Sequence, residues 1–278
     1  MQSSALRLER LEVRTVPSTV DGLHRLQPPA NDVFVATLYQ GELQRPVDQS
    51  SLTFWNNQTG NRTQVAAAIL NSNAAFSRAI ATDFRTFLGR DPDAVGMKFY
   101  LQALQGGATP QQLKASIMGS DEFFARVGGS GTAFLNALYS SELGRSVDGQ
   151  GQSFWQPLLG TAAGRAEIVN RVEGSTEATQ RFVASLYLDF LGRTPDATGL
   201  AYWSGQLQQG QSQTTVLAGV LGSDEFFHGM ESYVMQMNTT DPNLTASTFI
   251  ADAHLFQGQT AVIPAPQSGS QGINTFTP

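Results

Sequence analysis

Cysteine is absent from the 278-residue chain, and lysine nearly so, with only Lys98 and Lys114. The absence of cysteine excludes disulfide bonds, thiolate nucleophiles and cysteine-ligated zinc. Charged residues make up 14% of the chain, against about 25% in an average globular protein. Serine, threonine, asparagine and glutamine take their place, a composition that favours an extracellular bacterial protein or a repeat protein.

Basic clusters and long apolar runs are also missing. The formal net charge is −6, and the only grouped arginines are four spread over residues 7–25. Nucleic-acid binding needs a concentrated positive surface, and a membrane-spanning helix needs an apolar run of roughly 18 residues. We therefore expect no nucleic-acid partner and no transmembrane segment. Hydrophobic residues make up 41% of the chain, enough for one large or two modest packed domains.

The N-terminal stretch LRLERLEVRTVPST, residues 6–19, is not an ordinary signal peptide. It lacks an apolar stretch of about 7–15 residues and a small-residue cleavage site. One interpretation is a frayed leader. The other rests on Leu11, Glu12, Arg14 and Val16–Ser18, which resemble the leader of many planctomycete surface and secreted proteins. That resemblance implies an extracellular or cell-envelope location.

One thirteen-residue motif recurs four times, as LQRPVDQSSLTFW at 43–55, LGRDPDAVGMKFY at 88–100, LGRSVDGQGQSFW at 143–155 and LGRTPDATGLAYW at 191–203. Each copy carries an arginine, then an aspartate, then an aromatic pair. The arginines are Arg45, Arg90, Arg145 and Arg193; the aspartates are Asp48, Asp93, Asp148 and Asp196; the second aromatic residues are Trp55, Tyr100, Trp155 and Trp203. Such self-similarity predicts a repeat architecture.

The repeats are themselves duplicated in pairs. Copies one and three share LY..EL.R.VD, whereas copies two and four share FLGR.PDA.G and a later GSDEFF, at 119–124 and 222–227. A glycine-rich VGGSG lies between copies two and three. We therefore expect two similar halves, residues 33–127 and 132–229, joined by a flexible connection at 128–131.

Helical periodicity precedes each motif. Phe182, Leu186 and Phe190 recur at four-residue intervals, which places them on one helix face, and strand-like alternation is nowhere comparable. A similar stripe begins at Phe76, so we expect the last helix of repeat one to run directly into the first helix of repeat two. The sequence thus predicts an all-α fold of tandem repeats, each of about four short helices.

The motif itself has the residues of a corner between two helices. Gly192 suits the left-handed position that ends a helix, Pro195 cannot continue it, and Asp196 is a good N-cap for the next helix. We expect an arginine–aspartate contact across the turn, although exposed pairs contribute only about 0–1 kcal/mol. The aromatic pairs, tryptophans included, are expected to face the core, where losing one ring costs roughly 3 kcal/mol or more.

The pattern F(V/L)..LY...LGR.PD..GL.YW followed by S.EF, over residues 34–229, resembles a bacterial family of tandem repeats catalogued as a domain of unknown function. Its members occur in secreted and cell-surface proteins, often beside calcium-binding hemolysin-type repeats, and distantly resemble phycobilisome linker domains. The fourth copy matches best. The first departs at Gln44 and Asn71–Ser72, and the third lacks the proline and SDEFF. The resemblance implies a secreted helical module and names no ligand.

Calcium is the sharpest alternative chemistry. DPDAVG places Asp91 and Asp93 at the first and third positions of a loop like that of an EF-hand. Such a loop also needs an oxygen ligand at its fifth position and a glutamate at its twelfth, where this chain has Val95 and Gln102. Because the N-cap interpretation accounts for all four motif aspartates, it is favoured over calcium.

Catalytic motifs are not found. The three histidines are far apart: His24, His228 and His254. No metalloprotease, P-loop, dinucleotide-binding or nucleophile-elbow string occurs. Asp121–Glu122 and Asp224–Glu225 are carboxylate pairs of the kind that glycosidases use, but each follows a serine and is better explained as the acidic first turn of a helix. We expect no enzymatic activity, catalytic residue or cofactor.

The flanking segments carry fewer signals. Residues 1–32 are expected to be a leader or disordered, and 258–278 a disordered tail. Residues 230–257 are expected to contain a helix at 246–256 that covers the last repeat, as open stacks require. The sequence favours a non-enzymatic interaction or scaffold module that binds a protein or envelope component. A calcium- or glycan-binding surface module and an envelope hydrolase using Asp224–Glu225 are the alternatives.

Overall fold

The computed structural model describes residues 30–58 and 60–230, and every regular element within them is helical. Repeat one contains α1 (Ala30–Leu43), α2 (Gln49–Asn56) and α3 (Arg62–Leu70); repeat two contains α4 (Asn73–Asp83), the π-helical turn η1 (Phe84–Leu88), α5 (Ala94–Gln105), α6 (Pro110–Gly119) and α7 (Asp121–Arg126). Repeat three contains α8 (Gly131–Leu143), α9 (Gly149–Trp155), the 3-10 turn η2 (Gln156–Leu158) and α10 (Ala162–Glu173); repeat four contains α11 (Thr176–Leu191), α12 (Ala197–Gln208), α13 (Gln213–Leu221) and helical residues 224–230. The predicted all-α repeat fold is confirmed.

The motif forms the same corner in all four repeats. Gly89, Gly144 and Gly192 end the first helix in the left-handed conformation, with φ of 68°, 68° and 66°. Repeat one has Gln44 there, and its φ of 49° makes it the one non-glycine residue with positive φ among those described. The following helix is capped by an aspartate that accepts a hydrogen bond from a backbone N–H: Asp48, Asp93, Asp148 and Asp196. The corner prediction is confirmed, even where the glycine is missing.

The fourth helix of a repeat has two forms, each begun by a serine N-cap. After α6 and α13, Ser120 and Ser223 cap short separate helices. After α3 and α10, Ser72 and Ser175 cap α4 and α11, and these continue as the first helix of the next repeat. The expected continuity between repeats one and two is therefore present.

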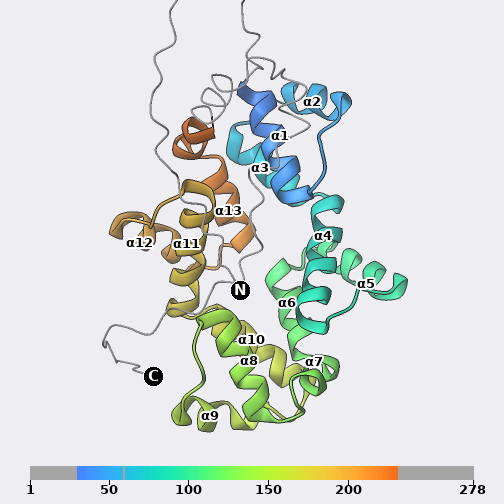
Figure 1. Ribbon diagram of the computed structural model, residues 1–278, viewed down its shortest axis with the longest axis vertical. Helices are drawn as coiled ribbons and strands as arrows, with labels where there is room; N and C mark the ends of the chain where they lie inside the picture. The colour runs from blue at the N-terminus through green and yellow to red at the C-terminus, as the bar shows by residue number, and fades with distance from the viewer. Residues whose placement is uncertain (1–29, 59, 231–278) are drawn as a thin grey trace, which may run out of the picture.

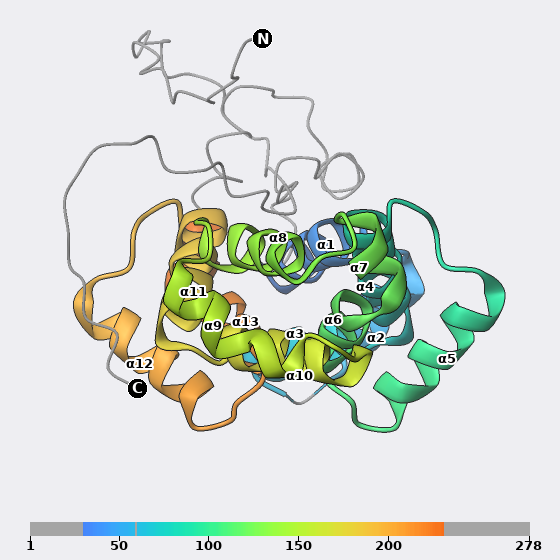
Figure 2. The ribbon, with the colours of Figure 1, turned by 90° about the horizontal axis from the view of Figure 1, so that it is seen from below.

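The four repeats close into a ring, which Figures 1 and 2 show from two sides. α6 packs along α10, and α13 packs along α3, so the two halves meet at both ends. Phe34 of α1 contacts Phe226 and Phe227 with ring centroids 6.4 and 6.2 Å apart, inside one buried apolar cluster that spans repeats one and four. The face of repeat four that an open stack would leave uncovered is thus covered by repeat one.

Both contacts between the halves depend on a glycine at the end of a helix. A Cβ on Gly119 would come within 2.8 Å of the Ala162 carbonyl oxygen and the Ala166 Cα. A Cβ on Gly222 would come within 2.5 Å of the backbone of Thr63. Backbone atoms at such distances cannot yield, so only glycine permits this approach. We call these contacts the α6·α10 joint and the α13·α3 joint.

The segment between the halves is a short turn. Gly128 and Gly129 have φ of 115° and 66°, values that favour glycine, and Ser130 caps α8. The sequence suggested flexibility at 128–131, yet both joints hold the halves that this turn connects.

Some expectations lie outside the described residues: the leader up to residue 29, the helix at 246–256, the tail at 258–278, and the two histidines His24 and His254. Within the described part, helices are too short or too polar to cross a bilayer.

Candidate functional site

The motif arginine lies between an aromatic ring and a carboxylate. Three of these arginines make two-pronged pairs with a glutamate 32 residues later, with N···O distances of 2.5–2.8 Å: Arg90 with Glu122, Arg145 with Glu177, and Arg193 with Glu225. Each guanidinium also lies 4.8–5.1 Å from the centroid of an aromatic ring six residues before it, with Arg45 over Tyr39 completing the set. The arginine therefore ties the corner to the N-terminus of the fourth helix.

The expected arginine–aspartate contact is secondary. It occurs at 3.8 Å for Arg45–Asp48 and for Arg193–Asp196. The arginine hydrogen bonds hold the pKa of Glu122 and Glu225 below the ordinary value. Sequence reasoning treated these glutamates as first-turn acids and missed their partners. The signal was a glutamate two residues after the serine cap in three repeats, where repeat one has Ala74.

The aromatic pair divides between surface and interior, which corrects the expectation that both rings face inward. The first ring is exposed in every repeat: Phe54 at 55%, Phe99 at 63%, Phe154 at 65% and Tyr202 at 57%. The second ring is turned inward: Trp155 is buried, and Trp55, Tyr100 and Trp203 are partly buried. Adjacent residues of a helix point in different directions, so one face of the helix cannot bury both.

The inward ring serves packing. The Trp55 indole N–H donates to the Tyr39 hydroxyl at 2.9 Å, and Trp155 makes the same bond to Tyr139 at 2.8 Å. In repeat two both partners are replaced together, by an edge-to-face contact of Phe84 with Tyr100 at 5.6 Å. The paired change shows that the second aromatic position is fitted to its own repeat.

The calcium candidates have protein partners. Arg85 donates to Asp91 at 2.5 Å, and Asp93 accepts the backbone N–H of Gly96 at 2.7 Å as the cap of α5. Across the described ranges, no group of three or more His, Asp or Glu side chains is placed to hold a metal ion. Calcium at Asp91 and Asp93 stays the disfavoured and untested alternative, which a calcium titration of the melting temperature tests.

The carboxylate pairs proposed for a hydrolase are both used in the joints. Arg165 donates to the Gly119 carbonyl at 3.0 Å, pairs with Asp121 and lies 4.5 Å from the Phe124 ring centroid. The second joint repeats these contacts. There Arg62 contacts the Gly222 carbonyl, the Asp224 carboxylate and the Phe227 ring. In each pair the aspartate thus joins the two halves, while the following glutamate holds the motif arginine.

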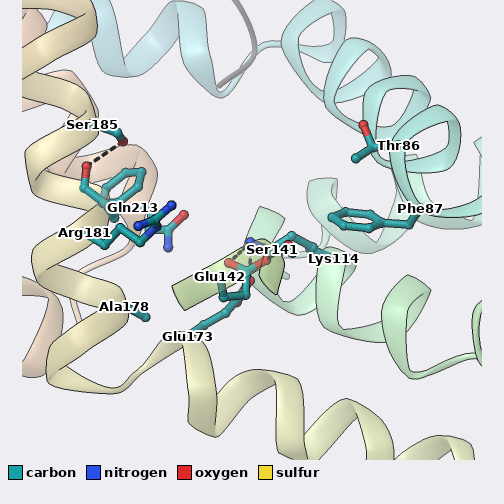
Figure 3. Close-up of a pocket in the computed structure, with 11 residues that line it drawn as sticks. Thr86, Phe87, Lys114, Ser141, Glu142, Glu173, Ala178, Arg181, Ser185 and Gln213 are labelled. Atoms are coloured by element: carbon teal, nitrogen blue, oxygen red, sulfur yellow. Dashed lines mark hydrogen bonds and ion pairs between the residues drawn. The ribbon is translucent and has the colours of Figure 1, made fainter. Parts of the chain in front are cut away.

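A cavity of about 240 Å³ lies between the two halves (Figure 3). Its walls come from η1, α6, α8, α10, α11 and α13. The lining residues are Thr86, Phe87, Lys114, Ser141, Glu142, Glu173, Ala178, Arg181, Phe182, Ser185 and Gln213.

Three buried charges meet at this cavity. The Lys114 ammonium lies 3.0 Å from the Glu142 carboxylate and also pairs with Glu173, and these side chains are only 19%, 14% and 5% exposed. Burial raises the pKa of Glu173 to about 7 against the opposing effect of Lys114. Burial likewise raises the pKa of nearby Asp83 to about 7.

The charged form is favoured at Lys114, whereas burial favours the neutral form of the two carboxyl groups. Burial alone lowers the pKa of Lys114, but the charges of Glu173 and Glu142 outweigh it and raise that pKa above the ordinary value. Clusters of buried groups with shifted pKa values beside a cavity mark candidate functional sites. Sequence reasoning missed this one, although Lys114 is one of only two lysines.

Comparison with known families identifies the repeats. A sequence model of the family described as Domain of unknown function (DUF4214) matches residues 72–127, 114–182 and 178–230, together more than half of the chain. The chain belongs to this family. The first DUF4214 match starts at the serine cap of α4, so the α1–α3 repeat lies before it. No curated protein and no solved structure matches the chain. The resemblances to planctomycete leaders and phycobilisome linkers stay predictions.

Proposed function

We propose that this protein is a non-enzymatic helical scaffold that binds a protein or envelope component through several equivalent aromatic contacts. One observation carries the proposal: each of the four repeats exposes one aromatic ring at the same position of the same helix. Aromatic residues are enriched in protein interfaces, and a single exposed ring needs no explanation, whereas four at one repeat position do.

The arrangement of the rings favours a multivalent interaction. The four aromatic side chains lie on α2, α5, α9 and α12, and Figure 2 shows α5 and α12 at opposite ends of the closed circle of repeats. The four rings therefore form separate contacts on one scaffold. Linked weak contacts of this kind give an affinity well above that of any one of them.

An extracellular or cell-envelope location belongs to the same proposal. The absence of cysteine, the low charge and the polar uncharged composition support it. Fractionation of native cells with an antibody against the chain tests it, and recovery in the cytosolic fraction alone would count against it.

The test compares two sets of substitutions in capture experiments from an envelope fraction. One variant carries Phe54→Ser, Phe99→Ser, Phe154→Ser and Tyr202→Ser. The control carries Val95→Ser and Leu188→Ser, which remove exposed apolar side chains outside the repeated position. We expect the first variant to lose the captured component, single substitutions to weaken capture only partly, and the control to retain it. Equal capture by all variants would refute the proposal.

A glycan is the second candidate partner, because exposed aromatic rings also stack on the apolar faces of sugars. The same variants separate the two, using purified polysaccharide or peptidoglycan in place of the protein fraction. Retention of the wild type and the control on glycan, with loss of the four-ring variant, would favour the glycan.

A further inference from the structure

We propose that the cavity between the two halves binds a small organic carboxylate, whose carboxylate group pairs with Arg181 and whose hydrocarbon part contacts Phe87 and Phe182. This inference goes beyond the scaffold function and does not depend on it. It rests on the partners of the charged groups around the cavity, on the cavity's size and on its apolar wall.

Arg181 is the charged group without a counter-ion. Its buried Nε has no hydrogen-bond partner, and none of the ion pairs in the described chain includes it. Figure 3 shows the guanidinium reaching from α11 towards Ser141 and Glu142, and its nitrogens lie beside Gly144 at the end of α8. A guanidinium left partly buried without a carboxylate is unfavourable, so a ligand carboxylate there would restore its missing partner.

The neighbouring charges do not supply that partner. Glu142 and Glu173 both pair with Lys114, and the Ser141 hydroxyl donates to the other oxygen of Glu142 at 2.7 Å. Counting one charge for each ionised group, the lining of two cations and two glutamates is neutral overall. An anion at Arg181 therefore meets no net negative charge in the cavity lining.

The cavity's size and wall select the ligand. A volume of about 240 Å³ is below the range of roughly 300–1,000 Å³ typical for drug-sized ligands, so the occupant has few carbon atoms. Phe87, Ala178 and Phe182 supply apolar surface, while Gln213 and Ser185 supply polar groups. The planar guanidinium fork matches a carboxylate. A carboxylate with a short hydrocarbon part uses both surfaces, whereas inorganic phosphate uses only the charge.

Binding is expected to strengthen as the pH falls from 8 to 6. The ionisable groups around the cavity are Asp83 on α4, Lys114 on α6, Glu142 on α8, Glu173 on α10 and Arg181 on α11. Burial raises the pKa of Asp83 and of Glu173 to about 7, so both carboxylates take up protons in this interval. Their protonation removes negative charge near Arg181, while the carboxylate of the ligand stays ionised.

Calorimetric titration and thermal melting of the full chain test the proposal. The probes are butyrate and benzoate, with inorganic phosphate and chloride as controls at constant ionic strength. We expect butyrate or benzoate to raise the melting temperature with increasing concentration. Arg181→Gln should lower the affinity roughly tenfold or more, the effect of losing a charged hydrogen bond. Arg171→Gln, which breaks only the exposed pair of Arg171 with Glu167, should leave the affinity unchanged.

A second variant protects the test against misfolding of Arg181→Gln. Ser185→Leu fills part of the cavity while keeping Arg181, and should abolish carboxylate binding with a near-normal unliganded melting temperature. Three results would overturn the proposal. The first is that neither carboxylate stabilises the protein up to about 50 mM, the range of very weak binding. The second is that phosphate or chloride stabilises it equally. The third is that the affinity for the carboxylates is unchanged in both variants.

Discussion

The two joints of the ring share one design and differ at their centres. Both use an arginine from the partner helix to hold a glycine carbonyl, an aspartate and a phenylalanine ring. Aligning the halves on Gly119 and Gly222 places three residues of the first joint opposite leucines of the second. The pairs are Lys114 with Leu217, Glu173 with Leu70, and Asp83 with Leu186.

Other charges are present on both sides. Glu142 corresponds to Glu42 when the shared LY..EL.R.VD stretches are aligned, and Arg181 corresponds to Arg78 in the alignment on Gly119 and Gly222. Burial raises the pKa of Glu42 although Arg78 opposes it, so both halves keep one buried glutamate near one arginine. Lys114, Glu173 and Asp83 have apolar counterparts, whereas Thr86 of the cavity lining corresponds to Asp189 on the other side.

The apolar joint shows that ring closure does not require those three charges. Buried ion pairs often contribute no more stability than well-packed apolar residues of similar volume. The charged centre of the α6·α10 joint is therefore an addition to a contact that the other joint makes without it.

Removing the cation should have the largest effect. Lys114→Met leaves Glu173 buried without a counter-charge, and we expect a loss of about 3–5 kcal/mol in the free energy of unfolding. The matched change Leu217→Met in the apolar joint should cost less than about 1.5 kcal/mol. Urea denaturation measures both, and similar losses would show that the two joints do not differ as described.

Converting the charged centre into its apolar counterpart should not lower the free energy of unfolding, in contrast to Lys114→Met. The triple variant Asp83→Leu, Lys114→Leu and Glu173→Leu copies the α13·α3 joint. At pH 8 we expect it to be as stable as the wild type or more stable, by up to about 4 kcal/mol. The same denaturation experiment measures this. A loss of stability would mean that the leucines of one joint do not fit the other.

The next largest effect concerns the pH dependence of the free energy of unfolding, which should differ between the charged and the apolar centre. The pKa of Asp83 and of Glu173 is raised to about 7 in the folded protein, so the folded state holds more protons than the unfolded state between about pH 4 and 7. Their contribution is fully present below the unfolded pKa values and is lost as the pH rises through 7. We expect the wild type to lose on the order of 3 kcal/mol more than the triple variant between pH 5 and 8, measured by melting at each pH. Parallel profiles would contradict these pKa shifts.

The smallest predicted effect concerns the corners of repeats one and three. Gln44 has φ of 49° where repeat three has Gly144, and a non-glycine residue in the left-handed region is strained. Gln44→Gly should raise the free energy of unfolding by about 0.5–1 kcal/mol. The neighbouring Gln40→Gly, inside α1, should lower it and serves as the control. A loss of stability in Gln44→Gly would show that the side chain of Gln44 contributes more than its backbone strain costs.

The corners could be predicted from sequence because the interactions that make them are local. Gly192 and Asp196 act within a few residues of themselves, so their chemistry is visible in the string. Ring closure could not, because the contact of Gly222 with Thr63 joins distant segments. The glycine's role appears only when the partner backbone is placed.

The candidate site was hidden for a related reason. Lys114 lies in a helix whose other residues follow an ordinary pattern, and its partners Glu142 and Glu173 come from two other helices. The available signals were the rarity of lysine in the chain and the comparison of Lys114 with Leu217 in the aligned halves. The outward rings were missed because periodicity was applied to the aromatic pair as a unit, although adjacent helical positions diverge.

The closed ring also fixes where a pulling force would act. The chain enters the described structure at α1 and leaves it at residue 230, and α1 contacts that residue, since the Thr37 hydroxyl lies 3.5 Å from the Met230 sulfur. Tension between the two ends would therefore pass straight through the α13·α3 contact without stretching the other repeats. Separating the two ends would break the contacts of Arg62 with the Gly222 carbonyl, the Asp224 carboxylate and the Phe227 ring.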